Sequence, residues 1–550
     1  MTRKEIINVL EEISDLMEFS GENPFKISAF KNGANTIRRF EGDFEILIEE
    51  KNLDSIKGIG KGLQNIIYEM FQSGNSSLLS ELKLQIPETL PELFKVRGLG
   101  PKKIRMLYKE LGIKSIIELE RACSEGRLTV ISGFTDKTEK KIFEEIEKIR
   151  ENEKFVLIYH ADMMNDSFIK ILEGIDSIIK YEVSGEFRRH CEVISKLEYV
   201  VFASSAENVK SKLMNTYHNL NLSEDFIEIN EFKIPILLHI VTSEDEFTSK
   251  LFVTTGSSQF IAIQNFEFDN NVKTEEDIFK SNKLPYHAPI FREKEYLDNS
   301  CAVKKITELV EEKDFHGFFH FHTTYSDGSN SLKEMVLGAK EKGYSYFVVC
   351  DHSKSAFYAN GLTEERILLQ HKEIKALSEE IKLPIFKGIE ADILSNGDLD
   401  YSDDFLHNFD FVVASVHSRF NLNEDEMTKR IIRAVENPKT NLLGHPTGRL
   451  LLSRDPYQVN IKMVIEACSQ NNVAIEINAN PRRLDLDWRH IFYAREMGCK
   501  FSINQDAHSV DDIKYLKYGV WMAQKGGISS NEVINCYSLE EFQSYLKTKR

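Results

Sequence analysis

Histidine and carboxylate side chains recur in the last part of the chain in a pattern that could bind divalent metal ions. Ten of the 15 histidines lie between residues 316 and 508. Imidazole and carboxylate groups together suit Zn²⁺, Mn²⁺ or Fe²⁺ rather than Ca²⁺. In a His-x-His pair on an extended chain both rings lie on one side, because side chains alternate with a period of two, so both can reach one ion. Nine such residues follow or end short apolar runs: His320, His322, Asp327, His352, Glu390, His417, His445, Asp506 and His508.

Seven short apolar runs, rich in Phe, Val and Ile, position these residues. Segments with helical periodicity, such as LKEMVLGAKEKG and MVIEACSQNN, separate most neighbouring runs. Strands that alternate with helices and carry polar residues at their carboxyl ends are typical of a TIM-like barrel, whose functional site lies at that face. A single histidine at a strand end is most often structural, but its recurrence favours a metal site. The runs span residues 318–328, 346–353, 384–393, 409–418, 440–449, 473–481 and 500–509.

Glycine turns repeat in the first third of the chain. LDSIKGIGKGLQNIIYEM at 53–70 and LFKVRGLGPKKIRMLYKEL at 93–111 each place a Gly-x-Gly turn between an apolar helix end and a basic helix. Residues 128–146 form a weaker copy, with Thr135 in place of the second glycine. Glycine permits positive φ and close approach of a phosphate, which the N–H groups opening the next helix can bind. This helix-hairpin-helix pattern predicts sequence-independent contacts with DNA backbone. The expected contact residues are Gly58, Gly60, Lys61, Gly98, Gly100, Lys102 and Lys103.

The charge distribution agrees with DNA binding by this region. The net charge is −17, but residues 1–150 carry 24 Lys and Arg against 25 Asp and Glu. The stretch from Lys95 to Lys109 contains basic residues and no acidic one. A local basic face is compatible with phosphate contacts, although a solvated helix surface is the alternative. Seven scattered cysteines without a CxxC pair suit the reducing cytoplasm, and no apolar run approaches the ~20 residues that span a bilayer.

The order of these segments resembles a bacterial family X DNA polymerase with a C-terminal polymerase-and-histidinol-phosphatase (PHP) phosphoesterase domain. GENPFKISAFKNGANTIRRF at 21–40 is similar to the opening helices of that family. The resemblance implies that the nine strand-end residues above are catalytic ligands of a three-metal cluster of Mn or Zn, with Fe as an alternative. A metal-bridged water, its pKa lowered towards ~7, would attack phosphorus. Arg419 and Arg449 are either phosphate clamps or structural ion-pair partners.

The middle of the chain resembles the family's palm, but its metal-binding carboxylates are replaced. Family X palms carry a Gly-Ser-x-Arg-Arg-Gly motif, an Asp-x-Asp pair and a third Asp, which hold two Mg²⁺ ions. The first motif is kept in part, at Gly185, Arg188 and Arg189. The pair reads Lys196-Leu197-Glu198, and the third Asp aligns with Leu237. An ammonium group and an aliphatic side chain cannot ligate Mg²⁺. We therefore predict a palm that is retained without polymerase activity.

These features predict a multidomain fold with three kinds of architecture. They are an α-helical helix-hairpin-helix N-terminal region, an α+β nucleotidyltransferase-like palm and thumb, and a C-terminal α/β distorted TIM-like (βα)7 PHP barrel. The expected boundaries are 1–85 for a helical DNA-binding domain, 86–150 for a fingers-like hairpin domain, 151–260 for the degenerate palm, 261–300 for a thumb-like segment, 301–315 for a linker and 316–550 for the PHP phosphoesterase domain.

The favoured function is a DNA-binding, metal-dependent phosphoesterase that acts as a 3′–5′ exonuclease or processes DNA 3′ ends or abasic sites. An active repair polymerase with a PHP exonuclease is disfavoured by Lys196 and Leu237. A small-molecule phosphatase of the histidinol-phosphatase type would leave the hairpins unexplained, and a non-enzymatic DNA-bound scaffold would leave the ligand set unexplained. We expect a cytoplasmic monomer whose partner is DNA and not a membrane.

Overall fold

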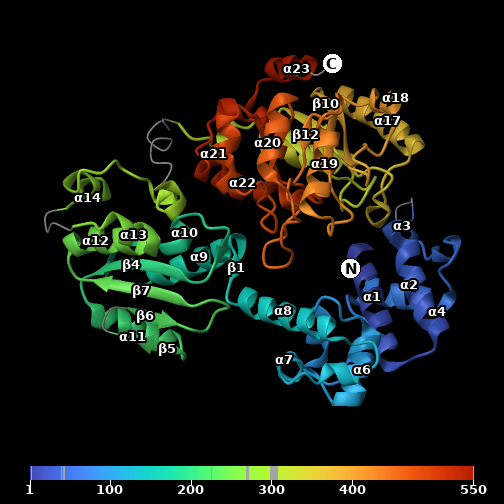
Figure 1. Cartoon of the computed structure of the whole chain (residues 1–550), viewed down its shortest axis with the longest axis horizontal. Helices are drawn as coiled ribbons and strands as arrows, with labels where there is room; N and C mark the ends of the chain where they lie inside the picture. Colours follow the sequence, from blue (N-terminus) through green and yellow to red (C-terminus); the bar gives the residue numbers. More distant parts are fainter. Residues whose placement is uncertain are drawn as a thin grey trace. The chain divides into compact units, whose positions relative to one another are not determined.

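The computed structural model describes residues 1, 3–38, 40, 44–223, 226–267, 272–297 and 308–548 (Figure 1). The start of the expected linker at 301–315 and parts of the thumb-like segment at 261–300 lie outside these residues. One compact unit comprises residues 1–153, and a second comprises nearly all of residues 154–550. No described helix is long and apolar enough to cross a membrane.

The first unit is helical and contains the glycine turns. Gly58 at φ +105° and Gly98 at φ +86° turn the chain before the helices that begin at Lys61 and Pro101. Each turn follows a short 3₁₀ segment and not the end of a longer α-helix, which corrects the expected hairpin shape. The helices are α1 (Arg3–Ser20), α2 (Pro24–Arg38), α3 (Phe44–Glu49), α4 (Lys61–Ser73), α5 (Ser77–Leu84), α6 (Pro101–Leu111), α7 (Ile116–Ser124) and α8 (Asp136–Glu153).

The palm region contains a five-stranded mixed sheet in the order β2-β4-β7-β6-β5. Side chains of β4 alternate between two cores: Val200 packs with Phe247 of α12, whereas Tyr199 and Val201 face the larger core shared with α9 and α11. The strands are β2 (Ile178–Ser184), β4 (Leu197–Ala203), β5 (Leu220–Leu222), β6 (Ile227–Ile229) and β7 (Ile236–Val241), with a separate pair β1 (Val156–Leu157) and β3 (Val193–Ile194). The helices are α9 (Ile158–Glu173), α10 (Gly185–Arg188), α11 (Ala206–Thr216), α12 (Glu244–Thr255), α13 (Ser258–Gln264) and α14 (Glu275–Ser281).

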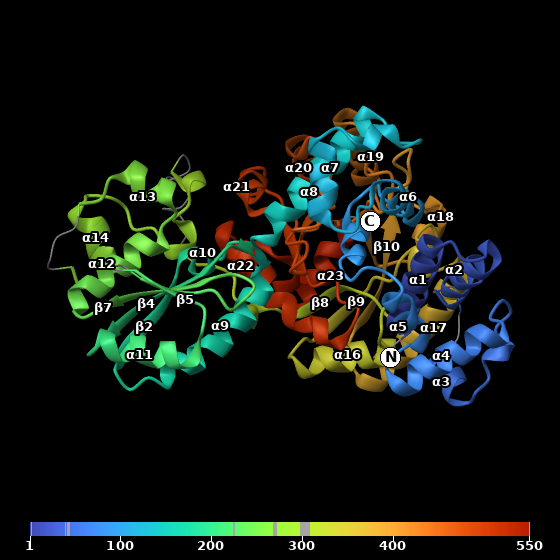
Figure 2. The same cartoon turned by 90° about the horizontal axis from the view of Figure 1, so that it is seen from below.

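The C-terminal region is a nearly closed barrel of seven parallel strands in consecutive order, surrounded by helices (Figure 2). A parallel bridge between Phe321 and Ala507 links its first and last strands. The strands are β8 (Gly317–Phe321), β9 (Tyr346–Val349), β10 (Ile385–Asp392), β11 (Phe411–Ser415), β12 (Leu442–Leu443), β13 (Ala474–Asn478) and β14 (Phe501–Asn504). The helices are α16 (Leu332–Glu341), α17 (Glu364–Ile381), α18 (Asp403–Leu406), α19 (Glu424–Val435), α20 (Ile461–Gln470), α21 (Trp488–Glu496), α22 (Leu516–Lys525) and α23 (Leu539–Lys547).

One end of the barrel is filled by apolar side chains. Phe319, Val348 and Val413 from three strands pack in one cluster with Phe542 of α23. The strands are buried on both faces, as in other parallel sheets covered by helices, and this explains their nearly continuous apolar runs. The predicted multidomain fold class is confirmed, and polar residues are left to the carboxyl ends of the strands.

Candidate metal centre

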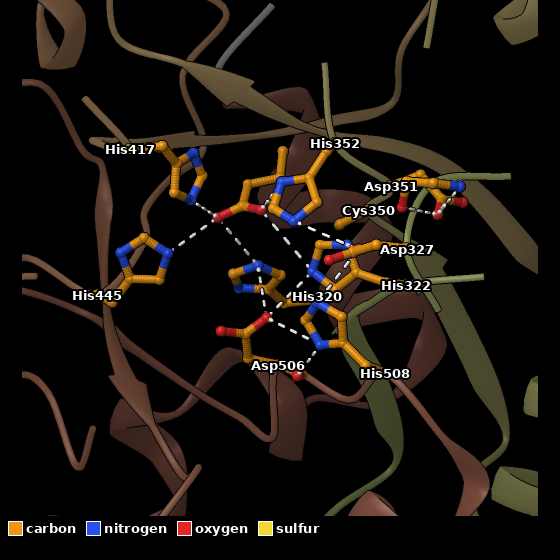
Figure 3. A network of polar contacts seen from close by, with 12 residues as sticks. His320, His322, Asp327, Cys350, Asp351, His352, His417, His445, Asp506 and His508 are labelled. Atoms are coloured by element: carbon orange, nitrogen blue, oxygen red, sulfur yellow. Dashed lines mark hydrogen bonds and ion pairs between the residues drawn. The ribbon is translucent and has the colours of Figure 1, made fainter. Parts of the chain in front are cut away.

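The nine strand-end residues come together at the carboxyl ends of the barrel strands (Figure 3). Their donor atoms form three overlapping groups, within each of which all donor atoms lie within 4.8 Å of one another. The groups are His322, Asp327, His352 and His508; His320, His322 and Asp506; and His352, Glu390 and His417. His445 joins them through Glu390, at 3.0 Å between Nε2 and Oε1. Three overlapping groups are the arrangement that a multinuclear cluster needs.

Glu390 lies at the centre of this arrangement. Its carboxylate oxygens lie 2.8 Å from His352 Nδ1 and 3.3 Å from both His320 Nε2 and His417 Nε2. Burial opposes ionisation of this carboxyl, but the surrounding imidazoles hold its pKa well below the ordinary value. One carboxylate that faces this many imidazoles would hold divalent cations together with the histidine nitrogens.

The imidazoles titrate unequally in the metal-free protein. Burial alone would lower the pKa of His417, but Glu390 and Asp392 raise it to about 10. Asp327 and Asp506 raise the pKa of His508 to about 9 against the same effect of burial. Burial and the neighbouring imidazoles of His508 and His352 lower the pKa of His322 to about 3. Protons on His417 and His508 thus balance charge that metal ions would otherwise supply.

Buried side-chain atoms without hydrogen-bond partners indicate that the site fits divalent cations. Side-chain nitrogen and oxygen atoms that are buried without a hydrogen-bond partner are rare in native proteins. Such atoms in this cluster include His320 Nε2, His322 Nδ1, Asp327 Oδ1, Glu390 Oε2 and His445 Nδ1. Mixed nitrogen and carboxylate donors suit Zn²⁺, Mn²⁺ or Fe²⁺.

The backbone around the ligands departs from regular strand geometry. The pairing of β8 with β9 shifts register at His320, whose φ is +48°. The simple period-two reason for the convergence of His320 and His322 is therefore wrong: a bulge redirects His320. Both rings still approach Asp506 Oδ1, at 3.7 and 3.0 Å. Asp506 (φ +52°) and His445 (φ +25°) also lie in the left-handed region, and such strain is concentrated at functional sites.

Two carboxylates that were not among the predicted residues orient the ligands. Glu476 Oε1 lies 2.5 Å from His320 Nδ1, and its Oε2 accepts a hydrogen bond from the His445 backbone N–H at 2.7 Å. Asp392 Oδ1 lies 2.5 Å from His417 Nδ1. Each fixes which ring nitrogen is presented to the cluster. In the sequence each is an acidic residue within an apolar run: Asp392 lies two residues after Glu390, and Glu476 lies in AIEIN.

Substitution of Glu476 by Gln is expected to weaken metal binding by about 10- to 100-fold, because His320 loses the carboxylate that fixes its tautomer. Metal affinity can be measured by competition with a chromophoric chelator. Glu496→Gln, on the exposed side of α21, is the matched control and should keep the wild-type affinity. Equal affinities of the folded Glu476→Gln and wild-type proteins would exclude this orienting role.

A third buried carboxylate, Asp351, fixes the loop that carries Asp327. It accepts hydrogen bonds from the backbone N–H groups of Thr323 (2.8 Å) and Ser326 (3.2 Å), from both of their hydroxyls, and from Gln370 Nε2 (2.5 Å). Gly328 lies so close to the His322 carbonyl that an added Cβ would approach it to 2.5 Å. These contacts hold the 323–328 loop against the ends of β8 and β9.

The two candidate arginines differ in their surroundings. Arg449 is buried and donates to the backbone carbonyls of Arg483 (2.9 Å) and Leu484, and it pairs with Asp487. This favours the ion-pair alternative for Arg449. Arg419 is exposed at φ +54°, two residues after His417. A third arginine, Arg483, lies with Nε 3.2 Å from Asp506 Oδ2 and was not among the predicted residues.

The palm motif residues are occupied by internal contacts. Strand pairing places Glu198 beside Leu237, the position aligned with the missing third carboxylate. Lys196 Nζ lies 2.9 Å from Glu198 Oε1. Arg188 is paired with Glu275 at 2.8 Å, and Arg189 with Glu293 at 2.9 Å. The only palm carboxylate that the alignment retained is therefore neutralised by the lysine that replaced its partner.

The expected DNA contacts lie at exposed positions of the helical unit. Gly58, Gly60, Gly98 and Gly100 are exposed, as are Lys61 and Lys102, whereas the intervening Ile59 and Leu99 are buried and anchor the turns. Lys103 Nζ donates to the Gly98 carbonyl at 3.0 Å. A cavity of about 550 Å³ beside this hairpin is lined by Arg97, Lys103, Lys137 and Lys141, together with Glu144 and Glu145.

Comparisons with known proteins find family matches in three parts of the chain. Family models match for a helix-hairpin-helix domain at residues 1–76, a SAM-like helix-hairpin-helix tandem at 90–148 and a PHP domain at 319–480. The DNA polymerase/3′-5′ exonuclease PolX of Bacillus subtilis (strain 168) is 35% identical over 575 residues, which cover 100% of both chains. The chain belongs to the PolX family.

Other relatives of this PolX family member match a smaller part of the chain. A probable phosphatase of Thermoanaerobacter sp. (strain X514) is 28% identical over 243 residues, which cover 42% of this chain and 94% of that protein. A probable phosphatase of Vibrio campbellii is 27% identical over 249 residues, which cover 42% and 92%. The resemblance to family X polymerases with a PHP domain is thus confirmed, and the chain combines helix-hairpin-helix DNA-binding modules with a PHP domain.

Proposed function

We propose that this PolX family member is a metal-dependent phosphodiesterase that binds DNA and removes nucleotides from 3′ ends, and that its palm no longer polymerises. The observation that carries the proposal is the nine-residue centre, which is complete, with its donor atoms directed at one another. We also propose the domain boundaries given from the sequence, except that the helical unit extends to Glu153.

The residues of the centre would hold divalent cations, which supply Lewis-acid activation of water and neutralise charge on the phosphate. Glu476 and Asp392 fix the rings of His320 and His417. The side chains of Asp327 and His508 are 32% and 26% exposed, whereas the other seven ligands are nearly buried, so the phosphodiester would enter beside these two. Arg419 and Arg483 are the cations available to orient the phosphate there.

Loss of polymerisation is supported by the charge at the palm. Two Mg²⁺ ions about 4 Å apart require several carboxylates. Glu198 is held ionised by His239 and Lys196 against the effect of burial, and the pKa of its carboxyl is lowered. Leu237 stands at the neighbouring position of the adjacent strand. A single carboxylate already paired with a lysine offers no site for two hard cations.

The test of this function is nucleotide release from end-labelled single-stranded and gapped DNA with added Mn²⁺. Wild type should shorten the DNA from its 3′ end, and His320→Ala and Asp506→Ala should not. A sugar phosphate is the comparison substrate, because relatives that match 42% of the chain carry the name of probable phosphatases. If wild type hydrolyses the sugar phosphate and leaves DNA intact, the small-molecule phosphatase is the correct function instead.

Substitution of Gly98 by Ala is expected to raise KM for DNA by about 5- to 10-fold with little change in kcat. The methyl group strains a φ of +86° and moves the backbone N–H groups that would bind phosphate. Gly112→Ala is the matched control, because it introduces the same methyl at φ +70° beyond the end of α6, away from the hairpin turn. An equal rise of KM in both variants would contradict a role of the hairpin in DNA binding.

A further inference from the structure

Arg483 brings an additional positive charge to the metal centre. Its Nε lies 3.2 Å from Asp506 Oδ2, and its side chain is 19% exposed. Within the described part of the chain, Asp506 is the only ion-pair partner of this guanidinium. A guanidinium has five N–H donors, so a side chain held by Nε can present its terminal nitrogens to a phosphate.

The backbone at Arg483 is held by Arg449, which crosses from the β12 end of the barrel. Arg449 Nε donates to the Arg483 carbonyl at 2.9 Å, and another of its nitrogens donates to the Leu484 carbonyl. The next residue, Asp485, accepts from the Thr447 N–H and hydroxyl, both at 2.9 Å. The segment that carries Arg483 is therefore tied to the GHPTGR loop by side-chain contacts and not by strand pairing alone.

Arg449 is in turn held by two carboxylates, one of which comes from the palm. Glu192 follows α10 of the palm and is 7% exposed. Its Oε1 lies 2.9 Å from Arg489 and 3.8 Å from Arg449, while Asp487 contacts the same two arginines. Glu192, Asp487 and the two guanidiniums form a compact cluster between the palm and the barrel, and Glu295 also approaches Arg489, at 3.7 Å between Oε1 and Nε.

Burial of the Glu192 carboxylate costs free energy unless its ion pairs with the two arginines are intact. A buried carboxylate that loses its partners is strongly disfavoured, and so is a buried guanidinium left unpaired. Removal of the Glu192 charge therefore frees Arg449 and Arg489 to rearrange around Asp487. The carbonyls of Arg483 and Leu484 would move with Arg449, because its remaining donors hold them.

We propose that Glu192 of the palm is a positioning residue of the phosphoesterase site, which acts through Arg449 and the 483–484 backbone to hold Arg483 against Asp506 and towards the substrate phosphate. The palm then contributes to hydrolysis without nucleotidyl transfer. This inference rests on the proposed function.

A double-mutant cycle on the full chain tests this coupling. Arg483→Gln is expected to lower kcat/KM for 3′-nucleotide release by about 10²-fold, and Glu192→Gln by about 10-fold, since small misplacements of a positioned group have effects of this size. In the Arg483→Gln background the Glu192→Gln change should have no further effect, because residues that act through one another are not additive. Glu207→Gln, an exposed palm carboxylate on α11, should leave the rate unchanged.

Two measurements separate positioning from a loss of folding. Equilibrium dialysis with thymidine 5′-monophosphate should show weaker binding in Glu192→Gln and Arg483→Gln, with the metal content of both equal to that of wild type. Arg489→Gln, at a side chain 44% exposed, removes the 2.9 Å contact with Glu192 but keeps the contact of Glu192 with Arg449, so it should lower kcat/KM less than Glu192→Gln does.

The outcomes distinguish this inference from the proposed function. If wild type releases no nucleotides from DNA, the proposed function fails. If wild type is active but the Glu192 and Arg483 effects multiply in the double variant, the coupling is wrong. Unchanged rates and nucleotide binding in Glu192→Gln and Arg489→Gln would also overturn it.

Discussion

Replacement of Glu390 by Ala is expected to lower kcat for 3′-nucleotide release by about 10³-fold or more. Its carboxylate lies within 3.3 Å of nitrogens from four histidines, so its loss removes the group that links the separate ligand sets. Metal ions contribute several kcal/mol to stabilisation of the transition state, and each 1.4 kcal/mol corresponds to about tenfold in rate. Release of end label under single-turnover conditions gives the rate directly.

Glu379→Ala, on the exposed surface of α17, is the control for this substitution. It should retain wild-type kcat and metal content. Elemental analysis of Glu390→Ala should show the loss of at least part of the bound metal. A variant with full metal content and at least one-tenth of the wild-type rate would show that Glu390 does not link the cluster.

Removal of metal is expected to make the stability of the barrel strongly dependent on pH. The pKa values of His417 and His508 are raised to about 10 and about 9 in the metal-free fold. Groups whose folded pKa is raised stabilise the protein fully below their unfolded pKa, about 6.5, and this contribution is lost as the pH rises through 9 and 10. Tm of the chelator-treated protein should therefore fall by about 5 °C or more between pH 7 and pH 10.

The metal-loaded protein should behave differently over the same range. Bound cations require neutral imidazoles, so metal affinity should rise from pH 7 to pH 9 as His508 and His417 release their protons. The pKa values of the Asp327, Glu390 and Asp506 carboxyls are lowered in the fold. Their contribution to stability is therefore lost only in acid, where these carboxylates take up protons. Differential scanning calorimetry with and without chelator provides the comparison. A Tm of the metal-free protein that rises towards pH 10 would contradict this charge assignment.

The sequence was sufficient to predict the barrel and the identity of the residues that meet in it. The seven runs are continuously apolar, as expected for parallel strands that are buried on both faces. Each run also ends in polar residues, and these ends converge on one face of the barrel. Recurrence of histidine at these ends was decisive, because the carboxyl ends of parallel strands necessarily meet. The glycine turns at Gly58 and Gly98 could also be predicted, since few residues other than glycine adopt a positive φ.

Other parts of the site depend on three-dimensional contacts without a local pattern. Glu476 and Asp392 lie on barrel strands and face inwards. The sequence of a strand indicates which side chains face inwards, but it does not indicate which ligand each of them contacts. Arg483 follows no periodic signal, and its contact with Asp506 joins two segments that the barrel closure brings together. The bulge at His320 was not predictable, because a register shift of one residue leaves no trace in the local composition.

In the palm, the sequence shows that Lys196 replaces a carboxylate, and the structure shows what this lysine contacts. Lys196 alone argued against Mg²⁺ binding on charge. The ion pair between its ammonium group and Glu198, at 2.9 Å, adds that the remaining carboxylate is already compensated. The ties from Glu192 to Arg489 and Arg449 could not be inferred from sequence, because they join residues 297 and 257 positions apart.

A primer–template incubated with Mn²⁺ and all four deoxynucleoside triphosphates tests the central claim, that the barrel holds the working catalytic site and the palm is inert. Products of wild type, Asp506→Ala and Glu198→Gln are resolved to single nucleotides. The account predicts that wild type and Glu198→Gln only shorten the primer and that Asp506→Ala leaves it unchanged. Primers extended by wild type or Asp506→Ala, with extension lost in Glu198→Gln, would contradict it.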